Sequence, residues 1–155
     1  MSNEARQTLP SPKQQQEAKS NEARHTSPGP RQQEGSASTP GPRRGEIWDV
    51  NWSPGRGAEQ QGTRPALIIQ NDRGNASSSY PLTIVASMSR TERELPLHVR
   101  ITPNPENGLT DFTDVKCEQV MTIEKSRLLR RRGVINTEEM NRVDNALRLS
   151  LSLLA

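Results

Sequence analysis

The chain has 155 residues and a formal net charge of +3, which fits about one mildly basic domain and permits a polyanionic partner without requiring one. A single cysteine, Cys117, excludes an intramolecular disulfide framework and favours a reducing compartment. The sequence has neither an apolar run of roughly 18 residues nor a hydrophobic N-terminal signal, so we expect a cytoplasmic protein with no membrane partner.

The first 42 residues have the composition of a disordered tail. They hold six of the twelve prolines, no aromatic residue, and only Met1 and Leu9 as large aliphatic residues. Such a segment cannot bury enough apolar surface to offset the entropy of ordering it. The run "SNEARQT" at 2–8 returns as "SNEARHT" at 20–26, which is typical of low-complexity duplication. We therefore predict a disordered, low-complexity tail over 1–42 and one folded domain over 43–155.

Five runs in the folded segment have strand character. In "EIWDVNW", period-2 alternation puts Trp48, Val50 and Trp52 on one face. The other four runs are "ALIIQ" (66–70), "LTIVASM" (82–88), "LPLHVRI" (95–101) and "FTDVKCEQVMTI" (112–123). Turn signals separate them, at Asn71-Asp72, Gly74-Asn75 and 103–108. Five closely spaced strands predict a small antiparallel sheet that curls into a partial barrel.

The hydrophobic period becomes helical near the C-terminus. The apolar positions are Met140, Val143, Leu147, Leu151 and Leu154. They predict an amphipathic helix that packs on the sheet, with Asn136 and Glu139 forming a capping box at its start. The basic run "RLLRRRG" at 127–133 reads as a solvated turn, with nucleic-acid binding as the alternative. The expected fold class is mainly β with a C-terminal α-helix.

Several segments together resemble a known family. The loop "PGRGAEQQGTRP" (54–65), followed by an apolar strand and "QND" (70–72), is similar to the corresponding part of the MazF/PemK/Kid toxins. The segments "RRGEIWDVNW" (43–52), "EQVMTIEKSRL" (118–128) and "VDNALRLSLSL" (143–153) resemble further family segments in the same order. The resemblance implies an SH3-like partial barrel of the CcdB/MazF type and a homodimer.

The resemblance also implies a function. Such proteins are toxins of type II toxin–antitoxin modules and metal-independent, sequence-specific endoribonucleases on single-stranded RNA. Attack by the 2′-hydroxyl gives a 2′,3′-cyclic phosphate or 3′-phosphate and a 5′-hydroxyl end. A cognate antitoxin is the implied protein partner, and operator DNA is bound mainly through the antitoxin complex. No cofactor is expected, and no metal, because no Cys/His/Asp cluster has ligand spacing.

Arg64 matches the catalytic arginine of that family. In-line attack on a phosphodiester builds negative charge on the phosphate oxygens, and a fixed cation lowers that barrier. A guanidinium stays charged and donates two parallel hydrogen bonds, so we interpret Arg64 as an electrostatic clamp rather than a proton donor. Pro65 biases the Arg64 backbone towards an extended conformation. A surface ion pair is the structural alternative.

The second catalytic candidate is Ser89, at the end of the predicted strand 82–88. Ser87 lies two residues away on the same face and is the alternative hydroxyl. Glu59 is the third candidate, either as acceptor of the 2′-hydroxyl proton or as a salt-bridge partner that shapes the loop. Ala58 stands where some family members have a histidine, so the identity of the general base stays open.

Substrate contacts are expected from Gln60, Arg56, Arg73 and Ser87. We predict that His98 faces solvent and that Cys117 is a strand residue rather than a nucleophile. Two other functions compete with the ribonuclease: a DNA-gyrase poison of the same fold, and a non-catalytic RNA- or antitoxin-binding module. The chain ends "SLSLLA" and lacks the Trp-Gly-Ile-like terminus of gyrase poisons, which disfavours the first of these.

Overall fold

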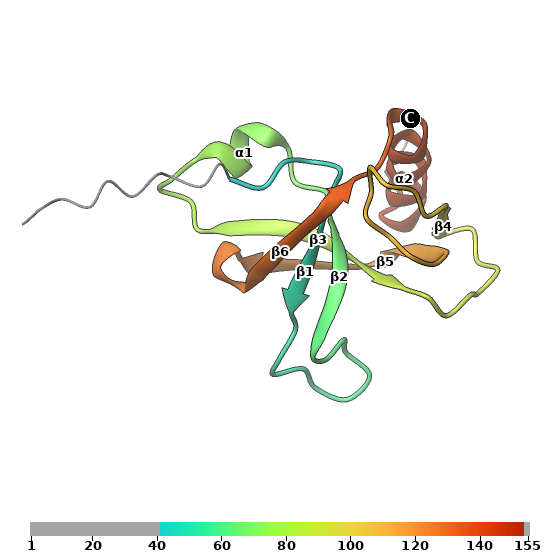
Figure 1. Ribbon diagram of the computed structural model, residues 1–155, viewed down its shortest axis with the longest axis horizontal. Coiled ribbons are helices and arrows are strands. Elements are labelled where there is room, and N and C mark those ends of the chain that lie inside the picture. Colours follow the sequence, from blue (N-terminus) through green and yellow to red (C-terminus); the bar gives the residue numbers. More distant parts are fainter. Residues whose placement is uncertain (1–40, 154–155) are drawn as a thin grey trace, which may run out of the picture. The chain divides into compact units, whose positions relative to one another are not determined.

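The computed structural model describes residues 41–153 (Figure 1). The tail predicted over 1–42 falls almost wholly outside the described residues, as does Leu154 of the predicted helix stripe. The described part contains strands β1 (Glu46–Asn51), β2 (Thr63–Ile68), β3 (Leu82–Ser89), β4 (His98–Ile101), β5 (Thr113–Glu124) and β6 (Leu128–Val134). Two α-helices, α1 (Asp72–Ala76) and α2 (Thr137–Ser150), and a 3-10 turn (Lys125–Arg127) complete it. The mainly β fold with a C-terminal helix is therefore confirmed.

The strands form one antiparallel sheet in the order β4-β5-β3-β2-β1-β6. Strand β5 carries the main irregularity, because Ala86 of β3 pairs with Val120 whereas the next residue, Ser87, pairs with Lys116. The first part of β5 therefore pairs with β4 and the end of β3, and its second part pairs with the start of β3. A register break of this kind bends the strand, which curls the sheet as predicted.

Two hydrophobic clusters lie on opposite sides of the strands. The cluster under α2 contains Ile47, Leu67, Met88, Ile101, Val115 and Val143. The other contains Val50, Trp52, Ala66, Ile68, Val85 and Ile123. The predicted common face of β1 is confirmed, because Val50 and Trp52 are buried in the second cluster and Trp48 packs against it.

Helix α2 begins with the predicted capping box. The Asn136 side chain accepts from the Glu139 backbone N–H at 2.8 Å, and the Glu139 carboxylate accepts from the Asn136 N–H at 3.1 Å. Val143 is fully buried, and the helix lies beside β4 and β5 (Figure 1). The predicted stripe runs past the end of the helix, because α2 ends at Ser150 and Leu151 is exposed.

The basic segment before α2 is not a solvated turn. It is strand β6, paired with β1, and its arginines bind carboxylates of that neighbour. Arg130 and Arg132 bind Asp49, and Arg131 binds Glu46. Both carboxylates are largely buried. Glu46 also accepts from the Arg43 N–H and from Trp48 Nε1, whereas Asp49 has its partners in residues 41–153 on the basic strand alone, so its charge is compensated when that strand lies beside it.

Two further sequence predictions are corrected. His98 does not face solvent: its side chain is 3% exposed, and Nε2 lies 2.8 Å from Glu118 Oε1 on the neighbouring strand. The turn predicted around Gly74 is the short helix α1, whose N-cap Asn71 accepts from the Gly74 N–H at 2.9 Å. Cys117 is confirmed as a strand residue; its burial raises the pKa of the thiol to about 12, so it stays protonated at neutral pH.

Candidate active site

The β1–β2 loop and β2 together position Arg64. Trp52 fixes the base of the loop, because its backbone N–H donates to Gly62 O at 2.9 Å and its indole Nε1 donates to Arg64 O at 3.3 Å. Gly62 has a φ of +69°, a conformation that suits glycine. Gln60 Nε2 reaches Met88 O at 3.4 Å, which ties the loop to β3. Arg64 therefore projects from a strand whose backbone is held on both sides.

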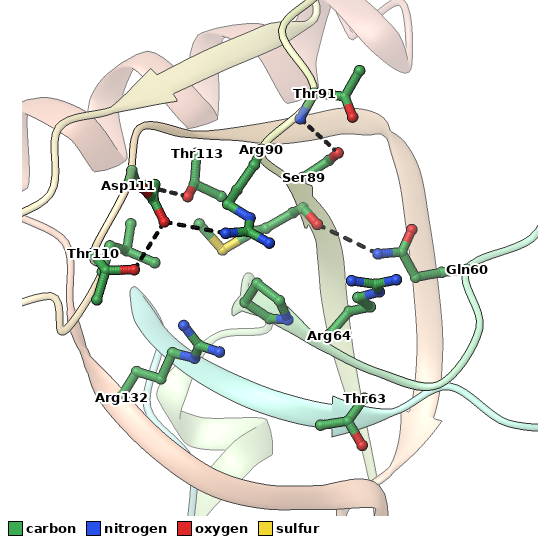
Figure 2. A pocket seen from close by; sticks show the side chains of 13 residues that line it. Gln60, Thr63, Arg64, Ser89, Arg90, Thr91, Thr110, Asp111, Thr113 and Arg132 are labelled. Carbon is green, nitrogen blue, oxygen red and sulfur yellow. Dashed lines mark hydrogen bonds and ion pairs between the residues drawn. The ribbon is translucent and has the colours of Figure 1, made fainter.

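Arg64 lines a cavity of about 470 Å³ at the end of β3 (Figure 2). The lining residues are Gln60, Thr63, Arg64, Pro65, Met88, Ser89, Arg90, Thr91, Leu109, Thr110, Asp111, Thr113 and Arg132. Figure 2 shows the side chains of Arg64, Arg90 and Arg132 reaching the cavity from different sides. Three guanidinium groups against one carboxylate, Asp111, make the cavity favourable for an anion.

Arg64 and Ser89 are brought together at this cavity. The β2–β3 ladder pairs Ala66 with Ser87, so continuing the antiparallel register sets Arg64 across from Ser89. Among residues 41–153, the Arg64 guanidinium makes no hydrogen bond or ion pair, and the residue is exposed. The Ser89 hydroxyl accepts from the Thr91 N–H at 3.1 Å, which leaves its proton free for donation. The cavity thus combines an unengaged cation with a hydroxyl donor.

Two other predicted residues lie close by but outside this cavity. Ser87 is 2% exposed, and its hydroxyl donates to Gln119 Oε1 at 2.7 Å. Glu59 lines an adjoining cavity of about 380 Å³, and its carboxylate accepts from the Arg56 N–H at 2.8 Å. Gln60 lines both cavities and therefore stands between Glu59 and the candidate site.

The remaining predicted contacts are not gathered at the cavity. Arg56 is exposed in the β1–β2 loop, and Arg73 lies on α1. The helix is joined to the start of β3 by the bond from Thr83 Oγ1 to Asn75 Oδ1, at 2.8 Å. Thr83 is six residues from Ser89 along an extended strand, which is about 20 Å. Within one chain, Arg73 therefore lies at the far end of β3.

Sequence reasoning missed the far wall of the cavity. Arg132 reaches it from β6, with Nε donating to Asp49 Oδ1 at 2.7 Å. Asp111 accepts from the Thr110 hydroxyl at 2.9 Å and from Arg90 at 3.2 Å. Both hydrogen bonds lower the pKa of the Asp111 carboxyl, and the bond from Thr110 has the larger effect. The one available signal for Arg132 was its place in a run of three arginines, which carried no indication of a partner strand.

The described part of the chain offers no evident metal site and no evident membrane segment. Residues 41–153 contain no group of three or more His, Cys, Asp or Glu side chains placed to hold a metal ion. No helix in the same range is long and apolar enough to cross a bilayer.

Comparisons with known proteins agree on one family. Residues 43–151 match the profile described as "PemK-like, MazF-like toxin of type II toxin-antitoxin system". The chain is 36% identical over 115 residues to endoribonuclease MazF9 of Mycobacterium tuberculosis, covering 72% of this chain and 97% of the relative. It is 39% identical over 114 residues to endoribonuclease EndoA of Bacillus subtilis, covering 72% of this chain and 96% of that relative. A mycobacterial endoribonuclease solved with its cognate antitoxin has the same fold, with a TM-score of 0.61 and 24% identity. The match covers 74% of this chain and 98% of that one.

Proposed function

Because the chain belongs to the PemK-like, MazF-like family of type II toxin–antitoxin toxins, we propose that it is an endoribonuclease that cleaves single-stranded RNA at specific sequences without a metal ion. Two relatives of nearly the same domain length are named endoribonucleases, which supports the activity. The observation that carries the proposal for this chain is a single cationic cavity lined by both the unengaged Arg64 guanidinium and the Ser89 hydroxyl.

The reaction is an in-line displacement at phosphorus. The 2′-oxygen of one nucleotide forms a bond to the adjacent phosphorus, and the bond from phosphorus to the 5′-oxygen of the next nucleotide breaks. The 2′-hydroxyl loses its proton, the leaving 5′-oxygen gains one, and the products are a 2′,3′-cyclic phosphate and a 5′-hydroxyl end. Later hydrolysis of the cyclic ester gives a 3′-phosphate.

Arg64 and Ser89 act on the charge that develops during this step. The five-coordinate phosphorus carries more negative charge on its non-bridging oxygens than the ground state does, so fixed donors aimed at those oxygens accelerate the reaction. Arg64 supplies a two-pronged cationic donor and Ser89 a neutral one. Glu59 supports the loop that carries Arg64, because its carboxylate is bound to the Arg56 N–H and lines the adjoining cavity.

The proposal extends to partners. The protein acts in the cytoplasm as a homodimer that a cognate antitoxin inhibits, and the pair binds operator DNA mainly through the antitoxin. A protein of the same fold, solved with its cognate antitoxin, supports the proposed antitoxin partner. A cavity with three arginines is a suitable receiver for an acidic segment of such an inhibitor as well as for RNA.

The test is cleavage of a long RNA by the purified protein in EDTA, with the ends mapped chemically. We expect 5′-hydroxyl ends at a recurring sequence, and no cleavage by Arg64→Ala, whose thermal unfolding and oligomeric state should match the wild type because Arg64 has no side-chain partner in residues 41–153. RNA left intact together with gyrase-dependent DNA breaks would show a gyrase poison instead. Intact RNA without such breaks would show a binding module.

A further inference from the structure

Arg132 forms a rigid part of the cavity wall. Its side chain is 26% exposed, and its Nε–H donates to Asp49 Oδ1 at 2.7 Å. That bond uses only one edge of the guanidinium. Among residues 41–153, its two terminal nitrogens have no hydrogen-bond partner, although the residue lines the cavity. A guanidinium held by one edge with its other donors free is organised for an oxyanion.

Asp49 provides the fixed point. Its side chain is 8% exposed, and its second oxygen, Oδ2, accepts from Arg130 Nε at 3.1 Å and from a terminal nitrogen of Arg130 at 3.0 Å. One carboxylate is thus shared by two guanidinium groups, which leaves the cluster with a net charge of +1. Arg130 is 72% exposed and does not line the cavity. The surplus positive charge is therefore presented to the cavity through Arg132.

Arg132 and Arg64 approach the cavity from separate strands. Arg64 lies on β2 and Arg132 on β6, with β1 between them in the sheet. Arg64 pairs with Val50 of β1, whereas Arg132 falls level with Ile47 and Trp48, so two strand spacings and this offset put the two backbones about 12 Å apart. Figure 2 shows the two side chains at different sides of the cavity. Two guanidinium groups that reach one cavity from different sides suit two phosphates of one RNA strand.

We propose that Arg132 binds the backbone phosphate next to the scissile one in the RNA substrate and that Asp49 is its positioning residue. This inference rests on the proposed ribonuclease function and deepens it. The neighbouring phosphate does not react, so its charge is the same in the ground state and in the transition state. Arg132 therefore supplies uniform binding, which lowers KM and leaves kcat almost unchanged.

Arg132→Gln and Arg130→Gln form a matched pair for the test. Each removes one guanidinium from Asp49, but only Arg132 lines the cavity. The probe is a short RNA that contains the mapped cleavage site, with a 2′-deoxy sugar at the cleaved nucleotide so that it binds without reacting. For Arg132→Gln we expect about tenfold weaker binding and a salt slope, log Kd against log salt, reduced by about 0.7. Arg130→Gln should stay within about twofold of wild type.

A modified probe separates this contact from any change in folding. An uncharged methylphosphonate in place of the neighbouring phosphate should weaken binding by the wild type and by Arg130→Gln, and should have almost no further effect on Arg132→Gln. Cleavage kinetics on unmodified RNA should show a raised KM and a retained kcat for Arg132→Gln.

The outcomes are distinct. Equal binding, salt slope and methylphosphonate response in the two variants, with both still cleaving RNA, would overturn the inference and leave the proposed function standing. Unchanged RNA binding together with weaker inhibition of Arg132→Gln by an acidic antitoxin peptide would assign Arg132 to a protein partner instead. A wild-type protein that cleaves no RNA would remove both proposals.

Discussion

The two serines on one face of β3 allow a crossed test of the site. Ser89 lines the cavity, whereas Ser87 is buried and bonded to Gln119. We expect Ser89→Ala to lower kcat by about 10²- to 10³-fold, the effect of removing one donor from a developing oxyanion. Ser87→Ala should lower it by no more than a few-fold, because its hydroxyl is already engaged and lies outside the cavity.

Stability should change in the opposite order. Ser87→Ala removes a 2.7 Å hydrogen bond to Gln119, which costs about 1 kcal/mol of unfolding free energy even though the exposed Gln119 side chain can bond to water instead. For a domain of this size, that corresponds to a Tm about 4–8 °C lower. Ser89→Ala removes only the 3.1 Å acceptor of the Thr91 N–H at the surface, so its Tm should move by less than half as much.

The assay is single-turnover cleavage of one RNA at a temperature well below both unfolding transitions, together with thermal unfolding followed by circular dichroism. A larger loss of kcat in Ser87→Ala than in Ser89→Ala, with both proteins folded, would refute the reasoning. The reacting phosphate would then be reached by Ser87, which would require the Gln119 side chain to leave it when RNA binds.

Three further predictions concern the scaffold. Asn136→Ala removes the cap acceptor of the Glu139 N–H and should cost about 1 kcal/mol in urea unfolding; an unchanged midpoint would contradict the capping assignment. Burial raises the pKa of Cys117 to about 12, against roughly 8.5 when unfolded, so unfolding releases a proton and stability falls as pH rises between these values; Cys117→Ala should lack this slope in unfolding curves. Gly133→Ala would press its Cβ against the Glu106 carbonyl oxygen, so its unfolding free energy should drop by about 1–3 kcal/mol, and a wild-type Tm would exclude this close approach.

The elements that sequence reasoning located are those with a local signal. Alternation identified β1, and spacing with Asn136 and Glu139 identified the start of α2, because each pattern reports on its own segment. Strand β6 was missed because "LLRRRGV" has no apolar alternation. It pairs with β1 and binds carboxylates about 80 residues earlier in the chain, such as Asp49, and such long-range pairing leaves no local trace.

The candidate site divides in the same way. Arg64 and Ser89 could be proposed because they lie in segments with a recognisable pattern, and both line the cavity. Arg132 was named only within the basic run 127–133, with nucleic-acid binding as the alternative, because its place at the cavity depends on which strand lies beside β1. The prediction that His98 faces solvent was wrong for a related reason. Alternation predicts which face a side chain occupies, but not whether a partner such as Glu118 covers that face.

Strand β5 belongs to two ladders at once, because it pairs with β3 on both sides of the register break and its first part also pairs with β4. Neither half of the sheet can therefore open while the other keeps its full complement of backbone bonds. Hydrogen exchange of β3 and β5 amides should accordingly report one shared opening event, with the amides of the β1–β2 loop exchanging far sooner. Such an arrangement joins the exposed β1–β2 loop to a single cooperative unit.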